Sequence, residues 1–370
     1  MLETVPFWMY FTGFLLLLGP LVTVHELGHY LVGRWFGVKA DVFSIGFGKE
    51  LAGFTDRRGT RWKLAAIPLG GYVQFAGDMN PASQPSEEWL ALPEEERART
   101  FQAKPKWQRA LIVAAGPVTN FLVAIAIFAA FNLAYGKQEV TPRIGEVAAA
   151  SAADRAGLRP GDEIVALDGE PVGDFLALRQ YIATHPGERL TFTIERDGER
   201  RELAVTLAST VTRDRFGNQF RIGQLGVYPT GDLRITPLGP VDAVALAVVQ
   251  TGETIDMMVT GLWQIATGRR SVKELGGPIK IAKFSGEQLS LGWANFVSFA
   301  ALISINLAFI NLLPIPALDG GHLAFYAAEA VRRKPASPRS QEWAFRTGIA
   351  FVLVLMLFVT INDVASLFDG

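Results

Sequence analysis

The sequence predicts a multi-pass α-helical membrane protein with about four transmembrane helices and a small α+β domain inserted between the second and the third. The composition supports the membrane part. Of the 370 residues, 49% are hydrophobic and only 19% are charged, and the mean hydropathy is +0.24. The inserted domain is indicated by short strand-like runs, separated by turn residues, that lie between the apolar stretches.

Four apolar stretches approach the roughly 20 residues that a helix needs to cross a bilayer. They cover residues 6–36, 110–134, 293–313 and 343–366. Tryptophans stand near their ends, as is typical of the membrane interface: Trp8, Trp107, Trp293 and Trp343. We therefore expect four spans.

A fifth stretch, residues 241–267, is less apolar. It carries Asp242, Gln250, Glu253 and Asp256 among hydrophobic residues at helical spacing. This pattern favours an amphipathic helix on the membrane surface over a fifth span.

Lysine and arginine concentrate in the loop between spans one and two and in the loop between spans three and four. Short cytoplasmic loops carry such an excess, so both loops are expected in the cytoplasm. Both termini and the inserted domain then lie outside. The formal net charge of −1 provides no basic field for nucleic acid, and no nucleic-acid partner is expected.

Residues 138–210 are expected to form the inserted domain. The strand-like runs "RLTFTIER" and "RELAVTL" flank the turn at Asp197-Gly198. The segment "SAADRAGLRPGDEIVALDGEPV" resembles the helix, turn and strand of a bacterial PDZ domain. PDZ domains bind extended peptides by adding a strand to a sheet edge. Binding of peptide ends and a purely steric cover are both compatible with the sequence.

The first apolar stretch contains the pattern H-E-x-x-H at His25, Glu26 and His29. On a helix, the two histidines share one face and can bind one ion, with the glutamate close to water at the metal. The chain has no cysteine, so a transition metal depends on imidazole and carboxylate, and zinc suits such ligands. Two interfacial histidines beside a glutamate are the alternative, but ionisable groups within a span are costly and usually functional.

A third ligand is expected from the segment "INLAFINLLPIPALDGGH", residues 305–322. Pro314 and Pro316 break the third span, and Asp319 follows the break, where its carboxylate can meet the two histidines if the spans pack together. The alternative makes Asp319 the N-cap of the next helix. His322 is expected to support the site rather than to bind the metal, because a fourth ligand would close the open position of a catalytic zinc.

Together these pieces resemble the site-2 protease family of intramembrane zinc metalloproteases, most closely the bacterial regulator of sigma-E protease type. The resemblance is carried by the PDZ-like segment and by "HELGH", "PLGGYVQFAGD", "AGPVTNF", "GGPIKIA" and "NLLPIPALDGGH". Some relatives have two PDZ domains, whereas this chain has room for one.

The resemblance implies that His25, His29 and Asp319 hold zinc and that Glu26 is the general acid and base. It also implies a membrane-reentrant β-hairpin at "LAAIPLGGYVQFAG", which offers an edge strand with Gly70, Gly71, Tyr72 and Val73 to the substrate. An amphipathic surface loop is the alternative there.

Further positions follow from the same resemblance. Asn306 and Asn311 match positions that contact substrate, with polar helix packing as their alternative role. In "AGPVTNF", Gly116, Pro117 and Asn120 are expected to serve close helix packing rather than catalysis.

The expected function is zinc-dependent intramembrane cleavage of single-span membrane proteins, such as anti-sigma factors and remnant signal peptides, after a first protease has trimmed them. The expected location is the cytoplasmic (inner) membrane of a bacterium, in contact with the lipid bilayer and with the active site toward the cytoplasmic side. A catalytically silent PDZ adaptor with a structural zinc is the alternative, but the intact Glu26 argues against it. A metal transporter is disfavoured because the ligands form one site rather than a relay across the spans.

Four regions are predicted. Residues 1–137 form an N-terminal membrane half and residues 138–210 the PDZ domain. Residues 211–292 carry the amphipathic helix, and residues 293–370 form a C-terminal membrane half.

Overall fold

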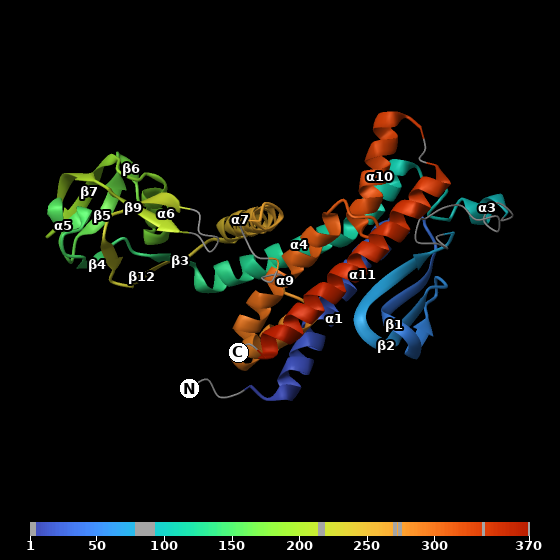
Figure 1. Cartoon of the computed structure of the whole chain (residues 1–370). Helices are drawn as coiled ribbons and strands as arrows, with labels where there is room; N and C mark the ends of the chain where they lie inside the picture. The colour runs from blue at the N-terminus through green and yellow to red at the C-terminus, as the bar shows by residue number, and fades with distance from the viewer. Residues whose placement is uncertain are drawn as a thin grey trace. The chain divides into compact units, whose positions relative to one another are not determined.

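The computed structural model describes residues 5–77, 93–213, 219–268, 272, 276–334 and 337–368. Within these residues, four helices are long and apolar enough to cross a membrane. They are α1 (Phe7–Trp35), α4 (Lys106–Tyr135), α9 (Trp293–Leu312) and α11 (Pro338–Phe368), shown in Figure 1. These four helices fit the predicted multi-pass membrane protein with about four transmembrane helices.

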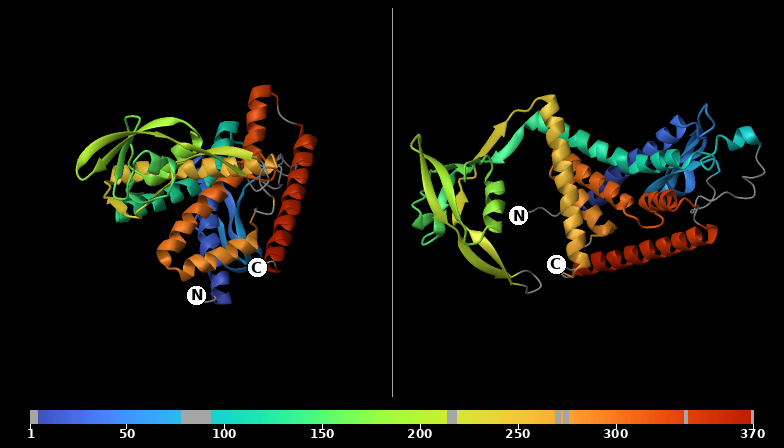
Figure 2. Two further views of the ribbon diagram at one scale, coloured as in Figure 1. Left: turned by 60° about the vertical axis from the view of Figure 1, so that its left-hand side comes forward. Right: turned by 90° about the horizontal axis from the view of Figure 1, so that it is seen from above.

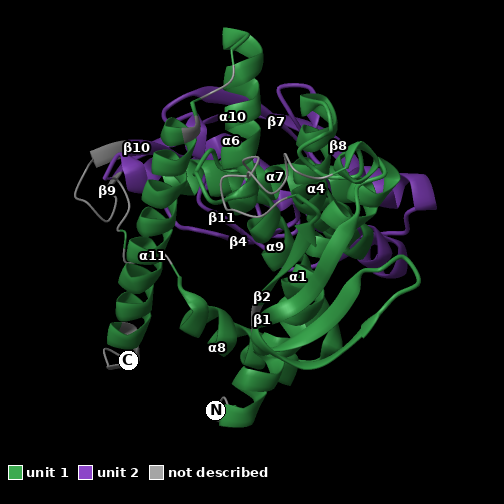
Figure 3. Cartoon of the chain, turned by 90° about the vertical axis from the view of Figure 1, so that its right-hand side faces the viewer, with its two compact units in different colours: residues 1–128, 247–262, 271–370 green, residues 129–246, 263–270 purple. Residues whose placement is uncertain are grey.

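The chain divides into two compact units, coloured separately in Figure 3. Unit 1 contains Met1–Phe128, Ala247–Leu262 and Ser271–Gly370, and unit 2 contains Ala129–Leu246 and Trp263–Arg270. The four predicted regions stay predictions.

Unit 1 holds the helices that carry the sequence motifs. Besides the long helices it contains α3 (Glu94–Arg97), α8 (Pro278–Ser290) and α10 (Asp319–Arg332). Helix α8 packs against α1 and α9 (Figure 2). A Cβ atom on Gly13 of α1 would lie 2.8 Å from the backbone of Ser285, so these two helices meet backbone to backbone. Glycine is required at this crossing because any side chain would separate the helices.

Helix α8 is capped by a residue from α11 rather than by one of its own. Its N-cap residue, Gly277, supplies no side chain. The buried carboxylate of Asp363 instead accepts hydrogen bonds from the backbone N–H groups of Gly277 and Lys280, each at 3.0 Å. This carboxylate satisfies orphan donors at the helix N-terminus and so joins α11 to α8.

The prediction of a hairpin within residues 64–77 is wrong, because residues 64–75 belong to a single long strand, β2 (Arg61–Phe75), which pairs with β1 (Ala40–Thr55). The two strands form a longer hairpin, whose turn lies at residues 56–60. Both strands bend, so the first part of β1 pairs with two parts of β2. Phe43, for example, lies opposite both Trp62 and Val73. Residues 71–75 therefore form an outer segment of the sheet that pairs with residues 40–45. The hairpin packs on α1 through an aromatic cluster that includes Tyr30, Phe43 and Phe75.

The long helices of unit 1 meet through two further apolar clusters. Leu17 and Leu21 of α1 pack with Phe296 of α9. Ala124 of α4 packs with two buried residues of α9, Ala301 and Ile305. These contacts bring α1, α4 and α9 together, although their sequences are far apart.

The fifth apolar stretch forms α7 (Pro240–Ala266). It is not among the helices that qualify as spans in the described chain. Within unit 1, its Ile255 and Met258 pack against the cluster of α4 and α9. The helix is as predicted, and its place at the membrane surface stays a prediction.

Unit 2 is an α+β domain. A four-stranded antiparallel sheet has the order β6-β5-β7-β8, and three pairs of strands accompany it: β4 with β11, β3 with β12, and β9 with β10. The bounds of its elements are β3 (Lys137–Val140), β4 (Ile144–Val147), α5 (Ala152–Arg155), β5 (Glu163–Leu167), β6 (Glu170–Pro171), α6 (Phe175–Thr184), β7 (Arg189–Arg196), β8 (Glu199–Thr206), β9 (Ala208–Arg213), β10 (Gln219–Gln224), β11 (Val227–Pro229) and β12 (Leu233–Thr236). The two strands predicted from "RLTFTIER" and "RELAVTL" are confirmed as β7 and β8.

Unit 2 has its own core and a buried ion pair at its edge. Ile144, Ile164 and Phe192 are fully buried in one cluster. The guanidinium of Arg196 donates to both carboxylate oxygens of Asp162, at 2.6 and 2.7 Å. Burial alone would raise the pKa of Asp162, but the hydrogen bonds from Arg196 outweigh this effect and lower the pKa.

Candidate metal centre

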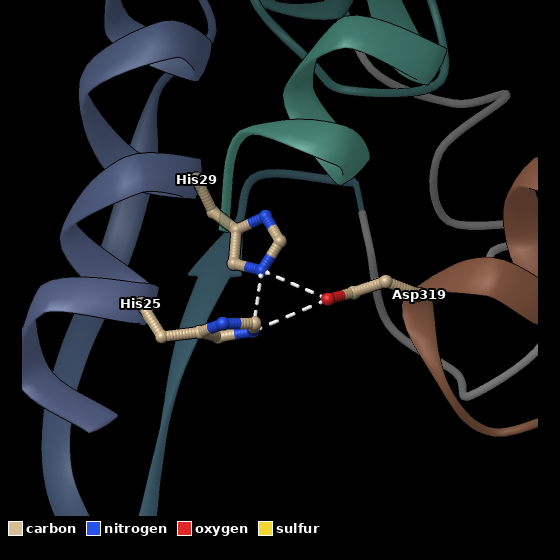
Figure 4. A group of neighbouring side chains, drawn as sticks. All are labelled: His25, His29 and Asp319. Atoms are coloured by element: carbon tan, nitrogen blue, oxygen red, sulfur yellow. Dashed lines mark hydrogen bonds and ion pairs between the residues drawn. The ribbon is translucent and has the colours of Figure 1, made fainter. Parts of the chain in front are cut away.

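Three side chains from two distant parts of the chain converge on one point (Figure 4). His25 and His29 project from one face of α1, and Asp319 comes from the first turn of α10. Nε2 of His25 lies 3.2 Å from Nε2 of His29, and these two atoms lie 3.2 and 3.5 Å from Oδ2 of Asp319. The structure thus brings together the three residues predicted as ligands.

This triangle of atoms fits a tetrahedral zinc ion. Ligand atoms at the usual zinc distances and tetrahedral angles lie about 3.3 Å from one another. In the described part of the chain, Oδ2 of Asp319 is buried and has no hydrogen-bond partner of acceptable geometry. A cation would satisfy this oxygen. Three protein ligands leave a fourth position for water or substrate, as in catalytic zinc sites.

The loop between α9 and α10 places Asp319. Helix α9 ends at Leu312, just before the two prolines, as predicted. A Cβ on Gly320 would lie 2.3 Å from the carbonyl oxygens of Leu312 and Leu313, so the loop folds back tightly onto the start of α10. The N-cap of α10 is Leu318, and Asp319 makes no capping hydrogen bond. Its carboxylate is directed toward the histidines instead, so the alternative role as an N-cap does not hold.

Residues of α4 contact the Nδ1 atoms of the two imidazoles. Nδ1 of His29 lies 2.8 Å from the backbone oxygen of Ile112. Nδ1 of His25 lies 3.3 Å from the side-chain amide of Asn120, which is fully buried. Such partners fix the ring orientation and the tautomer of a metal-binding histidine.

Gly116 of α4 faces the same two imidazoles. A Cβ at this position would lie 2.3 Å from Nε2 of His29 and 2.8 Å from Nε2 of His25. Helices α1 and α4 also approach closely at Gly28, where a Cβ would lie 2.5 Å from the oxygen of Ala115. Glycine at both positions lets α4 lie directly against the metal ligands.

Glu26 lies between the metal ligands and the outer segment of the hairpin. It lines a cavity of about 610 Å³ together with the three ligands. The backbone amide of Val73 hydrogen-bonds to its carboxylate. The other lining residues that were predicted to bind substrate are Gly70, Gly71, Tyr72, Val73 and Asn311.

Asn306 and His322 do not lie with the ligands and the predicted substrate-binding residues in the same way. Asn306 is half-buried on α9 and is not among the residues that line this cavity. His322 lines the cavity without joining the ligand triangle, and its ring packs on Phe345 of α11 with centroids 4.6 Å apart. The supporting role of His322 stays a prediction.

The family model named Peptidase family M50 matches residues 13–355, which is most of the chain. The chain belongs to peptidase family M50. The predictions of a peptidase and of the site-2 protease family are thereby confirmed.

Relatives of this M50 peptidase match over nearly their whole length. "Putative zinc metalloprotease Atu1380" of Agrobacterium fabrum is 46% identical over 362 residues, which cover 97% of this chain and 96% of the relative. "Metalloprotease MmpA" of Caulobacter vibrioides is 36% identical over 381 residues, with 96% of each chain covered.

Among solved structures, the PDZ domain of an SdrC-like protein from Listeria innocua is 19% identical. It covers 25% of this chain and 96% of its own length, with a TM-score of 0.20. This likeness is too weak to assign a fold to unit 2.

The sequence predicted that Gly116 and Asn120 of this M50 peptidase serve close helix packing near the site. The structure shows that both residues also touch the ligand histidines. Their spacing indicates that the two positions lie on one face of the helix, because residues four apart are neighbours on a helix surface. Nothing in the sequence, however, shows which helix that face meets.

Proposed function

We propose that this chain is a zinc-dependent intramembrane endopeptidase that cleaves single-span membrane proteins, such as anti-sigma factors and remnant signal peptides, after a first cleavage. One observation carries the proposal. Three ligand atoms lie at tetrahedral spacing with Glu26 beside them, and both histidines and Glu26 lie on α1, an apolar helix long enough to span a bilayer. The zinc in the name of the Agrobacterium fabrum relative agrees with this donor set.

The metal and Glu26 would have separate roles in the reaction. When bound, zinc supplies a Lewis acid that activates water for attack on a peptide carbonyl. The carboxylate of Glu26 accepts the proton released in this attack and delivers it to the departing amine. The hydrogen bond from the Val73 amide holds the carboxylate beside the ligand triangle. His25, His29 and Asp319 would hold the zinc.

The cavity beside Glu26 supports binding of an extended substrate. A substrate helix must unwind before its peptide bond can be attacked, and its freed backbone groups then need partners in an apolar setting. The outer segment of the hairpin pairs with β1 along one edge, and its residues 71–73 line the cavity together with Gly70. This segment would receive the substrate as an additional strand, and Asn311 would add an amide that donates and accepts. Membrane entry of the hairpin and substrate contact by Asn306 are part of the same proposal.

Unit 2 is proposed to be the PDZ domain of this protease. A groove of about 490 Å³ runs between α6 and residues 222–229, lined mainly by apolar residues such as Phe175, Ile182, Leu225 and Val227. A groove between a helix and a strand suits an extended peptide end. A steric cover that excludes substrates with bulky outer domains requires no such groove.

The proposed location is a bacterial cytoplasmic (inner) membrane. The orientation follows from the basic loops, with the termini and unit 2 outside and the metal centre toward the cytoplasmic side. Basic residues such as Lys104, Lys106 and Arg109 near the start of α4 support this orientation.

The test is the Glu26→Gln variant of the full chain, reconstituted in liposomes with a tagged single-span substrate. We expect zinc content equal to that of the unchanged protein and a cleavage rate lower by a factor on the order of 10³, because the proton acceptor is lost. Asp319→Ala should lose zinc as well as cleavage. Cleavage by Glu26→Gln at the unchanged rate would refute the protease mechanism. Failure of the unchanged, zinc-loaded chain to cleave would instead favour the adaptor.

A further inference from the structure

The geometry points to Asn120 as a positioning residue: its side-chain amide selects which nitrogen of His25 carries the proton and thereby sets the affinity of the metal centre. The inference rests on the proposed zinc site. It concerns how this chain prepares one ligand and adds a residue to those already assigned roles in catalysis.

The two ligand histidines have different partners at Nδ1. His29 faces the backbone oxygen of Ile112, which can only accept a hydrogen bond. His29 therefore keeps its proton on Nδ1, and Nε2 presents a lone pair to the metal. His25 faces the amide of Asn120, which can donate through Nδ2 or accept through Oδ1. The tautomer of His25 is thus set by the orientation of one amide.

In the structure, Nδ2 of Asn120 lies 3.3 Å from Nδ1 of His25. With the amide donating, Nδ1 accepts and the proton of His25 resides on Nε2. That nitrogen lies 3.2 Å from Nε2 of His29, whose lone pair can accept the proton, so the hydrogen bond joins the two histidines. This arrangement suits the metal-free centre, because it joins two ligands to each other.

Metal binding demands the opposite tautomer. Nε2 of His25 must lose its proton to offer a lone pair, and the proton then resides on Nδ1. Two donors would face each other unless the amide turned by half a rotation about its Cβ–Cγ bond. That rotation would bring Oδ1 to His25. Within the described residues, Oδ1 of Asn120 is buried without a hydrogen-bond partner, so the rotation breaks no other bond of this oxygen.

Helix α9 holds the backbone beneath this amide. The buried hydroxyl of Ser304 donates to the backbone oxygen of Asn120 at 2.8 Å. The side chain itself is fully buried, so its Cα position relative to His25 is fixed by packing. A half-turn of the terminal amide is compatible with this packing, because it leaves the volume filled by the side chain unchanged.

The experiment measures zinc affinity of the full chain in detergent by competition with a chelator. Asn120→Leu removes the acceptor and should lower the affinity 10- to 100-fold, the usual effect of losing a partner of a metal ligand. Asn120→Asp offers acceptors only, so it should bind zinc at least as tightly as the unchanged protein. The control is Asn132→Leu, which places leucine at another buried amide of α4, where the side chain donates to the oxygen of Ala243. Its zinc affinity should be unchanged.

A second readout reports the tautomer directly. Nitrogen chemical shifts of labelled histidine should show the proton of His25 on Nε2 in the zinc-free protein and on Nδ1 in zinc-free Asn120→Asp. This measurement decides the question even if Asn120→Leu fails to fold. The inference is overturned if Asn120→Leu binds zinc within threefold of the unchanged protein, or if the aspartate variant shows the unchanged tautomer. Failure of the unchanged protein to bind zinc would instead refute the proposed function.

Discussion

Gly116 on α4 lies so close to His29 on α1 that a single added methyl group would overlap the imidazole, with 2.3 Å between Cβ and Nε2. Gly116→Ala should therefore displace both ligand histidines. We expect zinc affinity to fall at least tenfold and cleavage to fall with it. Chelator competition and the cleavage assay check this result.

The matched control is Gly19→Ala. Gly19 lies on α1, the helix of both histidines, and a Cβ there would meet no atom within 4 Å. Alanine favours the helix by about 1 kcal/mol over glycine, so this variant should bind zinc and cleave normally. Equal zinc affinity in the two variants would contradict the close approach of α4 to the ligands.

Gly71→Ala should separate proton transfer from metal binding. A Cβ at Gly71 would lie 2.7 Å from the oxygen of Ser44 and 3.2 Å from Cγ of Glu26. The added methyl group should push the hairpin segment and the Glu26 carboxylate apart, and a displacement of about 1 Å can cost up to 10²-fold in rate. We expect kcat to fall at least tenfold while zinc content stays unchanged. Loss of zinc in this variant would show that the hairpin supports the ligands as well.

Asp363→Ala should destabilise α8. The variant leaves the N–H groups of Gly277 and Lys280 without the carboxylate of α11. Loss of a buried, charged acceptor costs about 2 kcal/mol. Hydrogen exchange of α8 in the full chain should accelerate accordingly. Glu342→Gln, which removes an exposed ion pair with Arg346 on the same helix, should leave the exchange of α8 unchanged.

The Asp162–Arg196 pair makes the stability of unit 2 depend on pH. Because the folded state lowers the pKa of Asp162 below its ordinary value of 3.8, the stabilisation is complete above that pH and is lost as the pH falls below it. Asp162→Asn should cost about 2 kcal/mol at pH 7 and progressively less below pH 3.8. Hydrogen exchange of β5 and β7 in the full chain, corrected for intrinsic rates, measures both effects. A pH-independent difference between the two proteins would show that the ion pair does not stabilise the domain.

Much of the fold could be read from the sequence because the relevant signals are local. Apolar length located the spans, alternation located β7 and β8, and Pro314 marked the end of α9. The pair His25 and His29 shares a face through helical periodicity alone. Asp319 required a further assumption, that the third span packs near the first.

The unpredicted parts depend on contacts between distant segments. The capping of α8 by Asp363 needs α11 beside α8, and no periodicity reports that proximity. Asn120 has the same appearance in the sequence whether its helix face meets lipid, another helix or a ligand histidine. The pairing of Phe43 with two parts of β2 likewise joins residues that lie far apart in the sequence.

The metal centre also determines when this protein becomes active during its synthesis. The two histidines leave the ribosome early on α1, whereas Asp319 follows only after both units have been largely translated. A nascent chain can hold zinc by two imidazoles at most, which is one protein ligand fewer than catalytic sites use. The first half of the chain alone therefore has an incomplete metal centre, which is completed only when the last third of the chain has been added.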